Sequence, residues 1–275
     1  MSLPRQVLGS TGVEVTRLGL GGEGVLRTFG YEAEAQAVID AAFAGGIRYF
    51  ESARAYSGSE AYLGRGLKGR RPEVFLSSKS HARSRQEAEN HLAVTLRHLD
   101  TDYLDLWQVH DLRTQEDLAA LSAPGGALEA FRWAKERGYA RFLGVTGHHD
   151  PEILRRALDL DDFDTILLPV NPAEPYDRSF LPLAQEARTR GLGVIGMKVL
   201  ARGLVEQLRV ARVTDFVRYA LSQPVDVVVI GADEVSQVEE LIDAARNFTP
   251  MPPEEQRRLE AAVRPFARGL MYYKP

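Results

Sequence analysis

Residues 73–108 read EVFLSSKSHARSRQEAENHLAVTLRHLDTDYLDLWQ, and the pattern within this stretch decides the fold. A short apolar run at 73–77 is followed by polar residues, then by apolar residues at helical spacing over Arg85–His98, then by a second apolar run at 103–108. Short apolar runs between polar residues are typical of buried strands, whereas repeats of three and four residues indicate one face of a helix. The stretch therefore predicts a strand, a helix and a second strand.

The same alternation recurs along the chain. We expect eight strands, near residues 16–20, 47–50, 73–77, 103–108, 141–145, 164–169, 192–197 and 226–230. Apolar residues at helical spacing predict helices over Glu32–Ala44, Arg85–His98, Leu128–Arg137, Glu152–Leu158, Leu181–Arg190, Asp215–Ser222 and Val235–Ala245. Strands that alternate with helices form parallel sheets, and eight such units favour a closed barrel. Because α/β barrels reach about 250 residues or more as one unit, residues 1–275 are predicted to form a single α/β domain, a (β/α)8 TIM barrel.

Two segments lie outside this repeat. Residues 5–15, with Ser10-Thr11-Gly12 between short flanks, predict an N-terminal β-hairpin that closes one end of the barrel. Residues 253–268 follow Pro252-Pro253 and predict an additional C-terminal helix. We expect the tail at 271–275 to reach the mouth of a substrate site.

The composition favours a small molecule as ligand. The chain is 44% hydrophobic and 26% charged, with a formal net charge of −4 and a pI near 5.9, so its charge offers no reason to expect nucleic acid or anionic lipid as a partner. It contains no cysteine, which excludes disulfides, a thiolate nucleophile and a cysteine-ligated zinc ion, and we expect a cytoplasmic protein. Neither a secretion leader nor a membrane span is expected from the hydropathy pattern. The oligomeric state is not predicted.

Four polar side chains follow successive strands. Glu51 ends the second predicted strand and Tyr56 lies in the loop after it, Lys79 follows the third strand, and His110 follows the fourth. Residues just beyond strand carboxyl ends share one rim of a barrel, so these four are expected to converge. An ammonium group beside a phenol favours the phenolate and lowers the phenol pKa, and an imidazole can orient or relay a proton. A phenol in such surroundings can protonate a developing alkoxide.

These segments resemble the aldo-keto reductases over nearly the whole chain. The resemblance is carried by Val7–Gly22 as the family's opening hairpin and first strand, by Tyr56-Ser57-Gly58-Ser59-Glu60 as the loop after its catalytic tyrosine, and by the order of the motifs. It implies NAD(P)H-dependent reduction of an aldehyde or ketone, in which a hydride passes to the carbonyl carbon. It further implies that Tyr56 is the general acid, that Lys79 lowers the Tyr56 pKa, and that His110 orients the substrate.

Glu51 departs from the family pattern, which usually has aspartate paired with the catalytic lysine. Glutamate keeps the charge but adds a methylene group, and a displacement of about 1 Å can matter greatly in catalysis. We expect Glu51 to hold Lys79, with a relaxed or inactive site as the alternative.

The resemblance also implies a set of cofactor contacts. Gly21 and Gly22 let a ring or ribose approach the backbone, whereas Thr146, Gly147 and Asn171 match the family's nicotinamide-binding positions, although Gly147 lacks the usual amide. Met197 stands where many members stack an aromatic ring. The remaining predicted contacts are Lys198, Val199, Leu200 and Gly203 after the seventh strand, and Gly231, Ala232, Gln237 and Glu240 after the eighth.

The phosphate-binding segment after the eighth strand lacks the usual basic residues. Gly231 and Gln237 stand where many members carry Lys and Arg, and Asp233-Glu234 add negative charge. NADPH is therefore expected from the resemblance, while NADH is not excluded. Lys198 and Arg202 are candidates to contact the pyrophosphate and, less favourably, a 2′-phosphate.

Two alternative functions stay open, and a metal site is considered but not expected. The chain is a nicotinamide-nucleotide sensor if Glu51 and the altered phosphate segment leave binding without turnover. It is an unrelated barrel lyase or hydrolase if Lys79 acts as a Schiff-base amine. His148-His149-Asp150 invites comparison with a metal site, but no matching ligand cluster accompanies it in the sequence and Asp150 suits a helix cap, so no metal ion is expected.

Overall fold

Eight parallel strands form a closed barrel in the computed structural model, which describes residues 2–275. The strands are β3 (Leu18–Gly24), β4 (Tyr49–Glu51), β5 (Phe75–Ser80), β6 (Leu104–Val109), β7 (Ala140–Thr146), β8 (Thr165–Pro169), β9 (Gly193–Met197) and β10 (Val227–Ala232). Each strand pairs with the next along the chain, and β10 pairs with β3 to close the ring. The predicted (β/α)8 TIM barrel is confirmed.

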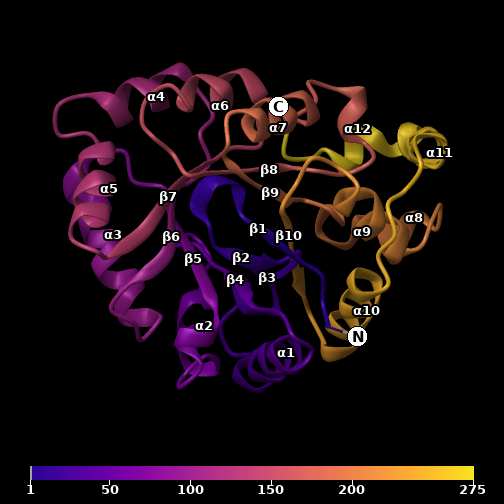
Figure 1. The fold of residues 1–275 in the computed structure, drawn as a ribbon, viewed down its shortest axis with the longest axis horizontal. Helices are drawn as coiled ribbons and strands as arrows, with labels where there is room; N and C mark the ends of the chain where they lie inside the picture. Colours follow the sequence, from indigo (N-terminus) through magenta and orange to yellow (C-terminus); the bar gives the residue numbers. More distant parts are fainter. Residues whose placement is uncertain (1) are drawn as a thin grey trace.

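Helices surround the barrel on its outside (Figure 1). They are α1 (Glu32–Ala44), α2 (Ser59–Gly66), α3 (Arg85–His98), α4 (Gln115–Ser122), α5 (Ala127–Glu136), α6 (Pro151–Ala157), α7 (Leu181–Thr189), α8 (Leu204–Leu208), α9 (Val213–Leu221), α10 (Val235–Arg246), α11 (Pro253–Val263) and α12 (Ala267–Leu270). The seven predicted helices are present, with ends that agree to within two residues. None of the described helices is long and apolar enough to cross a membrane.

The N-terminal hairpin seals one end of the barrel, as predicted. Strand β1 (Arg5–Val7) pairs antiparallel with β2 (Glu14–Thr16). Leu8 and Val15 are buried and join the apolar side chains inside the barrel. The Ser10 amide donates a hydrogen bond to Gly191 O, 2.8 Å away, which ties the hairpin to the end of α7. The hairpin lies across the centre of the ring in Figure 1.

Three predicted elements end more than two residues from where they were placed. The third strand was placed at 73–77 with Lys79 after it, but β5 extends to Ser80 and includes Lys79. The first barrel strand was placed at 16–20, but Thr16 belongs to the hairpin and β3 runs on through Gly21 and Gly22 to Gly24. An apolar-run criterion stops at glycine, whereas the β3 ladder with β10 continues through it. The predicted C-terminal helix over 253–268 is broken after Val263 by a 3₁₀ turn at Arg264–Phe266, because Pro265 offers no amide hydrogen and its ring crowds the preceding turn.

Candidate active site

Two adjoining cavities open at the carboxyl ends of the strands. The first, which we call the groove, has a volume of about 400 Å³ and is lined by Gly22, Lys198, Leu200, Gly231, Gln237 and Leu241, among others. The second, the mouth, has a volume of about 380 Å³ and is lined by Lys79, His110, Asp111, His148, Tyr272 and Lys274, among others. Both cavities are lined by Glu23, Arg27, Tyr56, Met197, Lys198 and Arg202. A ligand in the groove therefore meets a ligand in the mouth beside Tyr56.

Glu51 and Lys79 form a buried ion pair at this junction. Glu51 is the last residue of β4 and pairs with Ser77 of β5, so Lys79 lies two residues further on, on the same side of the sheet. Lys79 Nζ lies 2.8 Å from Glu51 Oε1 and donates a hydrogen bond to Ser52 O, also 2.8 Å away. The exposed fraction of the two side chains is 1% and 5%. The extra methylene of glutamate thus still allows the carboxylate to reach the lysine.

The ion pair keeps Lys79 charged. Burial, the largest single effect, acts to lower the Lys79 pKa, but Glu51 and then Tyr56 act against it, and the pKa of Lys79 is raised above its ordinary value. A Schiff-base lysine needs a lowered pKa so that its amine is free to attack. The environment of Lys79 therefore disfavours the lyase or hydrolase alternative.

Tyr56 is packed between charged groups and His110. Lys79 Nζ lies 4.8 Å from the centroid of the Tyr56 ring, and the His110 ring meets it edge-on with centroids 5.8 Å apart. Gly22 makes this position accessible, since a Cβ there would lie 3.1 Å from Tyr56 Cδ2 and 2.3 Å from Ser59 Oγ. Burial raises the pKa of Tyr56, and Lys79 only partly opposes it. The expectation of a lowered pKa was wrong because it considered the neighbouring charge without the desolvation.

His110 directly follows β6 and faces the mouth. Burial, followed by the charge on Lys79, holds the pKa of His110 well below its ordinary value. Its imidazole is therefore neutral near pH 7 and carries one N–H donor. A neutral donor beside Tyr56 is suited to hold a carbonyl oxygen.

Most of the predicted cofactor residues line the cavities. Those that line the groove are Gly21, Gly22, Met197, Lys198, Val199, Leu200, Gly203, Gly231, Gln237 and Glu240. Thr146 lines the mouth. Gly147, Asn171 and Ala232 are buried and do not line either cavity. The roles of these residues as cofactor contacts stay predictions.

Asn171 is engaged by the C-terminal tail. Its Nδ2 donates hydrogen bonds to the Tyr273 hydroxyl, 2.8 Å away, and to Lys198 O, 3.2 Å away. The tail is held further by Glu174, whose carboxylate accepts from the Tyr273 hydroxyl at 2.7 Å and pairs with Lys274 Nζ at 2.9 Å. Tyr272, Tyr273 and Lys274 line the mouth, as predicted for the tail.

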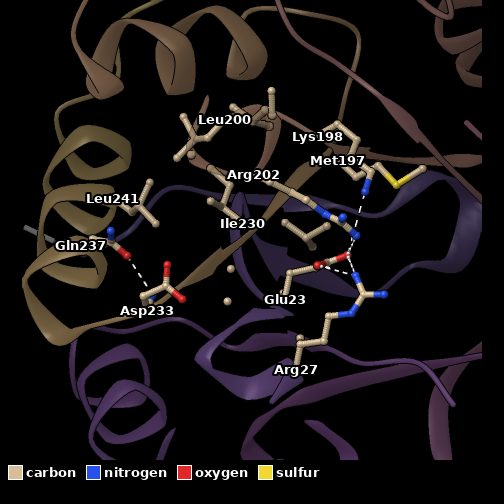
Figure 2. A pocket seen from close by; sticks show the side chains of 18 of the residues that line it. Glu23, Arg27, Met197, Lys198, Leu200, Arg202, Ile230, Asp233, Gln237 and Leu241 are labelled. Atoms are coloured by element: carbon tan, nitrogen blue, oxygen red, sulfur yellow. Dashed lines mark hydrogen bonds and ion pairs between the residues drawn. The ribbon is translucent and has the colours of Figure 1, made fainter. Parts of the chain in front are cut away.

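A cluster of three cations around one carboxylate lies where the cavities meet (Figure 2). Glu23 pairs with Arg27 at 2.8 Å, with Arg202 at 3.3 Å and, more weakly, with Lys198 at 3.9 Å. Burial is the largest cause that lowers the pKa of Lys198, which is about 8. Glu23 and Arg27 were not predicted from the sequence, although both follow the Gly21-Gly22 pair, which was. The cluster carries two more positive than negative charges.

The far end of the groove has a different character. Asp233, Gln237 and Glu240 line it, and the Asp233 amide donates to Gln237 Oε1 at 2.8 Å (Figure 2). This end agrees with the expected loss of basic residues from the phosphate-binding segment.

Comparisons with known proteins show what the chain is similar to. The model of the Aldo/keto reductase family matches residues 17–216. L-galactose dehydrogenase of Arabidopsis thaliana is 28% identical over 228 residues, which make up 74% of this chain and 67% of that protein.

Solved structures share the fold. The holo form of an aldo-keto reductase from Bacillus halodurans matches with a TM-score of 0.80 at 24% identity, covering 94% of this chain and 96% of that one. An aldo-keto reductase from Klebsiella pneumoniae in complex with NADPH matches with a TM-score of 0.76 at 21% identity, covering 96% of each chain.

Proposed function

The chain belongs to the aldo/keto reductase family and is an oxidoreductase, and we propose that it reduces an aldehyde or ketone to an alcohol with NADPH as the reductant. The observation that carries this proposal is the Glu51–Lys79 ion pair beside Tyr56, at the point where the groove and the mouth meet. A group in the groove and a small molecule in the mouth are brought together there.

The groove suits a dinucleotide. Its volume of about 400 Å³ lies within the range of roughly 300–1,000 Å³ usual for small-molecule sites. The excess of two positive charges in the Glu23 cluster is matched by the two negative charges of a pyrophosphate, which Arg27, Lys198 and Arg202 would hold. When bound, the reduced nicotinamide supplies a hydride.

Tyr56 supplies the proton, and the side chains around it support the transfer. The Tyr56 hydroxyl donates its proton to the carbonyl oxygen as the alkoxide develops, and the raised pKa of the phenol keeps that proton in place until then. Lys79 stabilises the phenolate that remains, and Glu51 keeps Lys79 charged. Neutral His110 donates a hydrogen bond that orients the carbonyl group. After the reaction, the Tyr56 phenolate regains a proton from water in the mouth.

NADPH is proposed because an aldo-keto reductase of the same fold from Klebsiella pneumoniae was crystallised with it. Asp233, Gln237 and Glu240 at the far end of the groove offer no cation to a 2′-phosphate. NADH is therefore tested alongside NADPH.

Turnover of a carbonyl panel tests the proposal. The purified protein is mixed with NADPH or NADH and with aldehydes, ketones and dicarbonyls, and the absorbance of the reduced cofactor is followed. Tyr56→Phe should lower kcat by roughly 10²–10⁴-fold, the usual value of a positioned general acid. Tyr272→Phe, which removes another phenol that lines the mouth, is the matched control and should leave most of the activity. No turnover above that of Tyr56→Phe with any substrate counts against the proposal.

The groove also supports a second candidate, a nicotinamide-nucleotide sensor. The acidic lining of the far end is the observation that favours it. This candidate expects tight cofactor binding by fluorescence titration, no useful turnover, and hydride transfer that is no faster in Glu51→Asp.

A further inference from the structure

Three side chains from two loops converge at the rim of the mouth. Asp111 lies in the loop after β6, and His148 and His149 lie in the loop after β7. His148 Nε2 is 3.4 Å and His149 Nε2 is 3.8 Å from Asp111 Oδ1, and the three atoms lie within 4.8 Å of one another. All three residues line the mouth.

The Asp111 carboxylate presents one occupied and one free oxygen. Arg113 donates to Oδ2 from Nε at 2.8 Å and from Nη2 at 2.5 Å. Oδ1 is buried and accepts no hydrogen bond from any described residue. A buried acceptor without a donor costs about 1–3 kcal/mol, so a cation bound at Oδ1 would relieve that cost.

The two imidazoles are available as ligands. An imidazole binds a metal ion through a nitrogen lone pair, and the Nε2 atoms of His148 and His149 both lie beside Asp111 Oδ1. Imidazole and carboxylate together suit Zn²⁺ and its neighbours among the divalent transition metals.

The spacing of the atoms also suits such an ion. Ligands about 2.0–2.1 Å from a tetrahedral ion are about 3.3 Å apart. The distance of 3.4 Å between His148 and Asp111 already agrees with this value, and the distance of 3.8 Å for His149 needs a shift of about half an ångström.

We propose that Asp111, His148 and His149 bind a divalent transition-metal ion such as Zn²⁺ or Co²⁺ at the rim of the mouth, with the remaining coordination positions open to that cavity. From the sequence, Asp150 was the neighbouring candidate for a third ligand, and no metal ion was expected. Asp150 instead accepts a hydrogen bond from the Glu152 amide and caps α6. The carboxylate is supplied by Asp111, which precedes the histidines by nearly forty residues. The charges on Arg113 and Lys198 oppose a dication, so the affinity is expected to be moderate.

Co²⁺ is the probe for this site, because its visible absorption reports coordination by nitrogen and oxygen. The full chain without cofactor or substrate is titrated, so the result does not depend on the proposed reductase activity. One Co²⁺ per chain should bind and be displaced by Zn²⁺. Asp111→Asn and His149→Gln should each weaken binding by at least the ~10–100-fold seen when a residue that only orients a ligand is lost.

The controls separate this site from other histidines. Asp111 has a φ of 57°, and asparagine tolerates this conformation well, so Asp111→Asn is expected to keep the loop in place. His81, Glu87 and His91 form the other group with metal-ligand spacing in the described chain, and His81→Ala should leave Co²⁺ binding unchanged. Zn²⁺ should raise the Tm of the wild-type protein but not that of Asp111→Asn. Absence of saturable binding, unchanged binding in Asp111→Asn, or loss of binding in His81→Ala would overturn the proposal.

Discussion

Replacement of Glu51 by glutamine measures what the central ion pair contributes. The substitution keeps the shape of the side chain but removes the charge that lies 2.8 Å from Lys79 Nζ. Because both side chains are at most 5% exposed, Lys79 is left buried without a counter-ion, and loss of one partner of a buried pair costs about 3–5 kcal/mol. Since 1 kcal/mol shifts the Tm of a domain of this size by about 2–4 °C, the Tm should fall by roughly 6–20 °C.

The pH dependence gives this prediction a second readout. In the wild-type protein the raised pKa of Lys79 means that its contribution to stability is present at neutral pH and is lost as the pH rises through the folded-state pKa. In Glu51→Gln the unpaired lysine has a folded-state pKa below its unfolded value. The stability of this variant therefore rises as the pH increases from the folded-state pKa of Lys79 to its unfolded-state pKa. The difference in stability between the two proteins should therefore narrow from pH 7 to pH 10.

Thermal unfolding followed by circular dichroism across this pH range is the assay. Glu51→Asp is the matched control, since it keeps the charge and loses one buried methylene, which costs about 1 kcal/mol. A Glu51→Gln protein with the Tm of the wild type at pH 7, or a difference that widens as the pH rises, would refute the reasoning.

Three further substitutions test other parts of the site. Cofactor affinity, measured by fluorescence titration, should decrease as the pH rises through about 8, the pKa of Lys198, because the ammonium group that attracts the pyrophosphate is lost. In Lys198→Arg the guanidinium stays charged, so the affinity should show no such decrease. Glu174→Gln leaves Lys274 buried without its partner, so urea unfolding should show a loss of about 3–5 kcal/mol, and unchanged stability would contradict the role given to the tail. Gly22→Ala places a Cβ 2.3 Å from Ser59 Oγ, 2.9 Å from Glu51 O and 3.1 Å from Tyr56 Cδ2. Because the chain around the site must shift to accept it, kcat should fall while the circular dichroism spectrum stays that of the wild type. Full activity would contradict the need for close packing at this position.

The sequence predicted the elements whose pattern is local. Helices such as α3 and α10 have regular apolar spacing, and each begins and ends within one residue of its apolar pattern. Helix α2 was missed because it contains Gly64 and Gly66, which are poor helix formers. A Cβ at Gly64 would lie 2.2 Å from His98 O, so packing of α2 against α3 requires glycine at this position. The same glycine lowers the helix propensity of the segment, and the helix was therefore not predicted.

The convergence of Glu51, Tyr56, Lys79 and His110 could be predicted, since the barrel brings the carboxyl ends of its strands together. The prediction that Lys79 follows its strand was wrong, because β5 extends to Ser80. The Asp111–His148 approach could not be found, because it joins loops whose paths the sequence does not define. The hydrogen bond from Asn171 to Tyr273 spans 102 positions and was missed for the same reason.

The hairpin lies at the end of the barrel opposite the candidate active site, so residues that stabilise the fold there are separate from those of the site. Leu8 and Val15 complete the apolar interior, whereas every residue discussed for binding or proton transfer lies beyond the strand carboxyl ends or at them. Free-energy changes at sites that are more than about 7–10 Å apart and share no partner usually add. Stabilising substitutions around the hairpin can therefore be combined with altered rim loops. The thermal stability and the substrate selectivity of this scaffold can be improved in separate rounds of engineering.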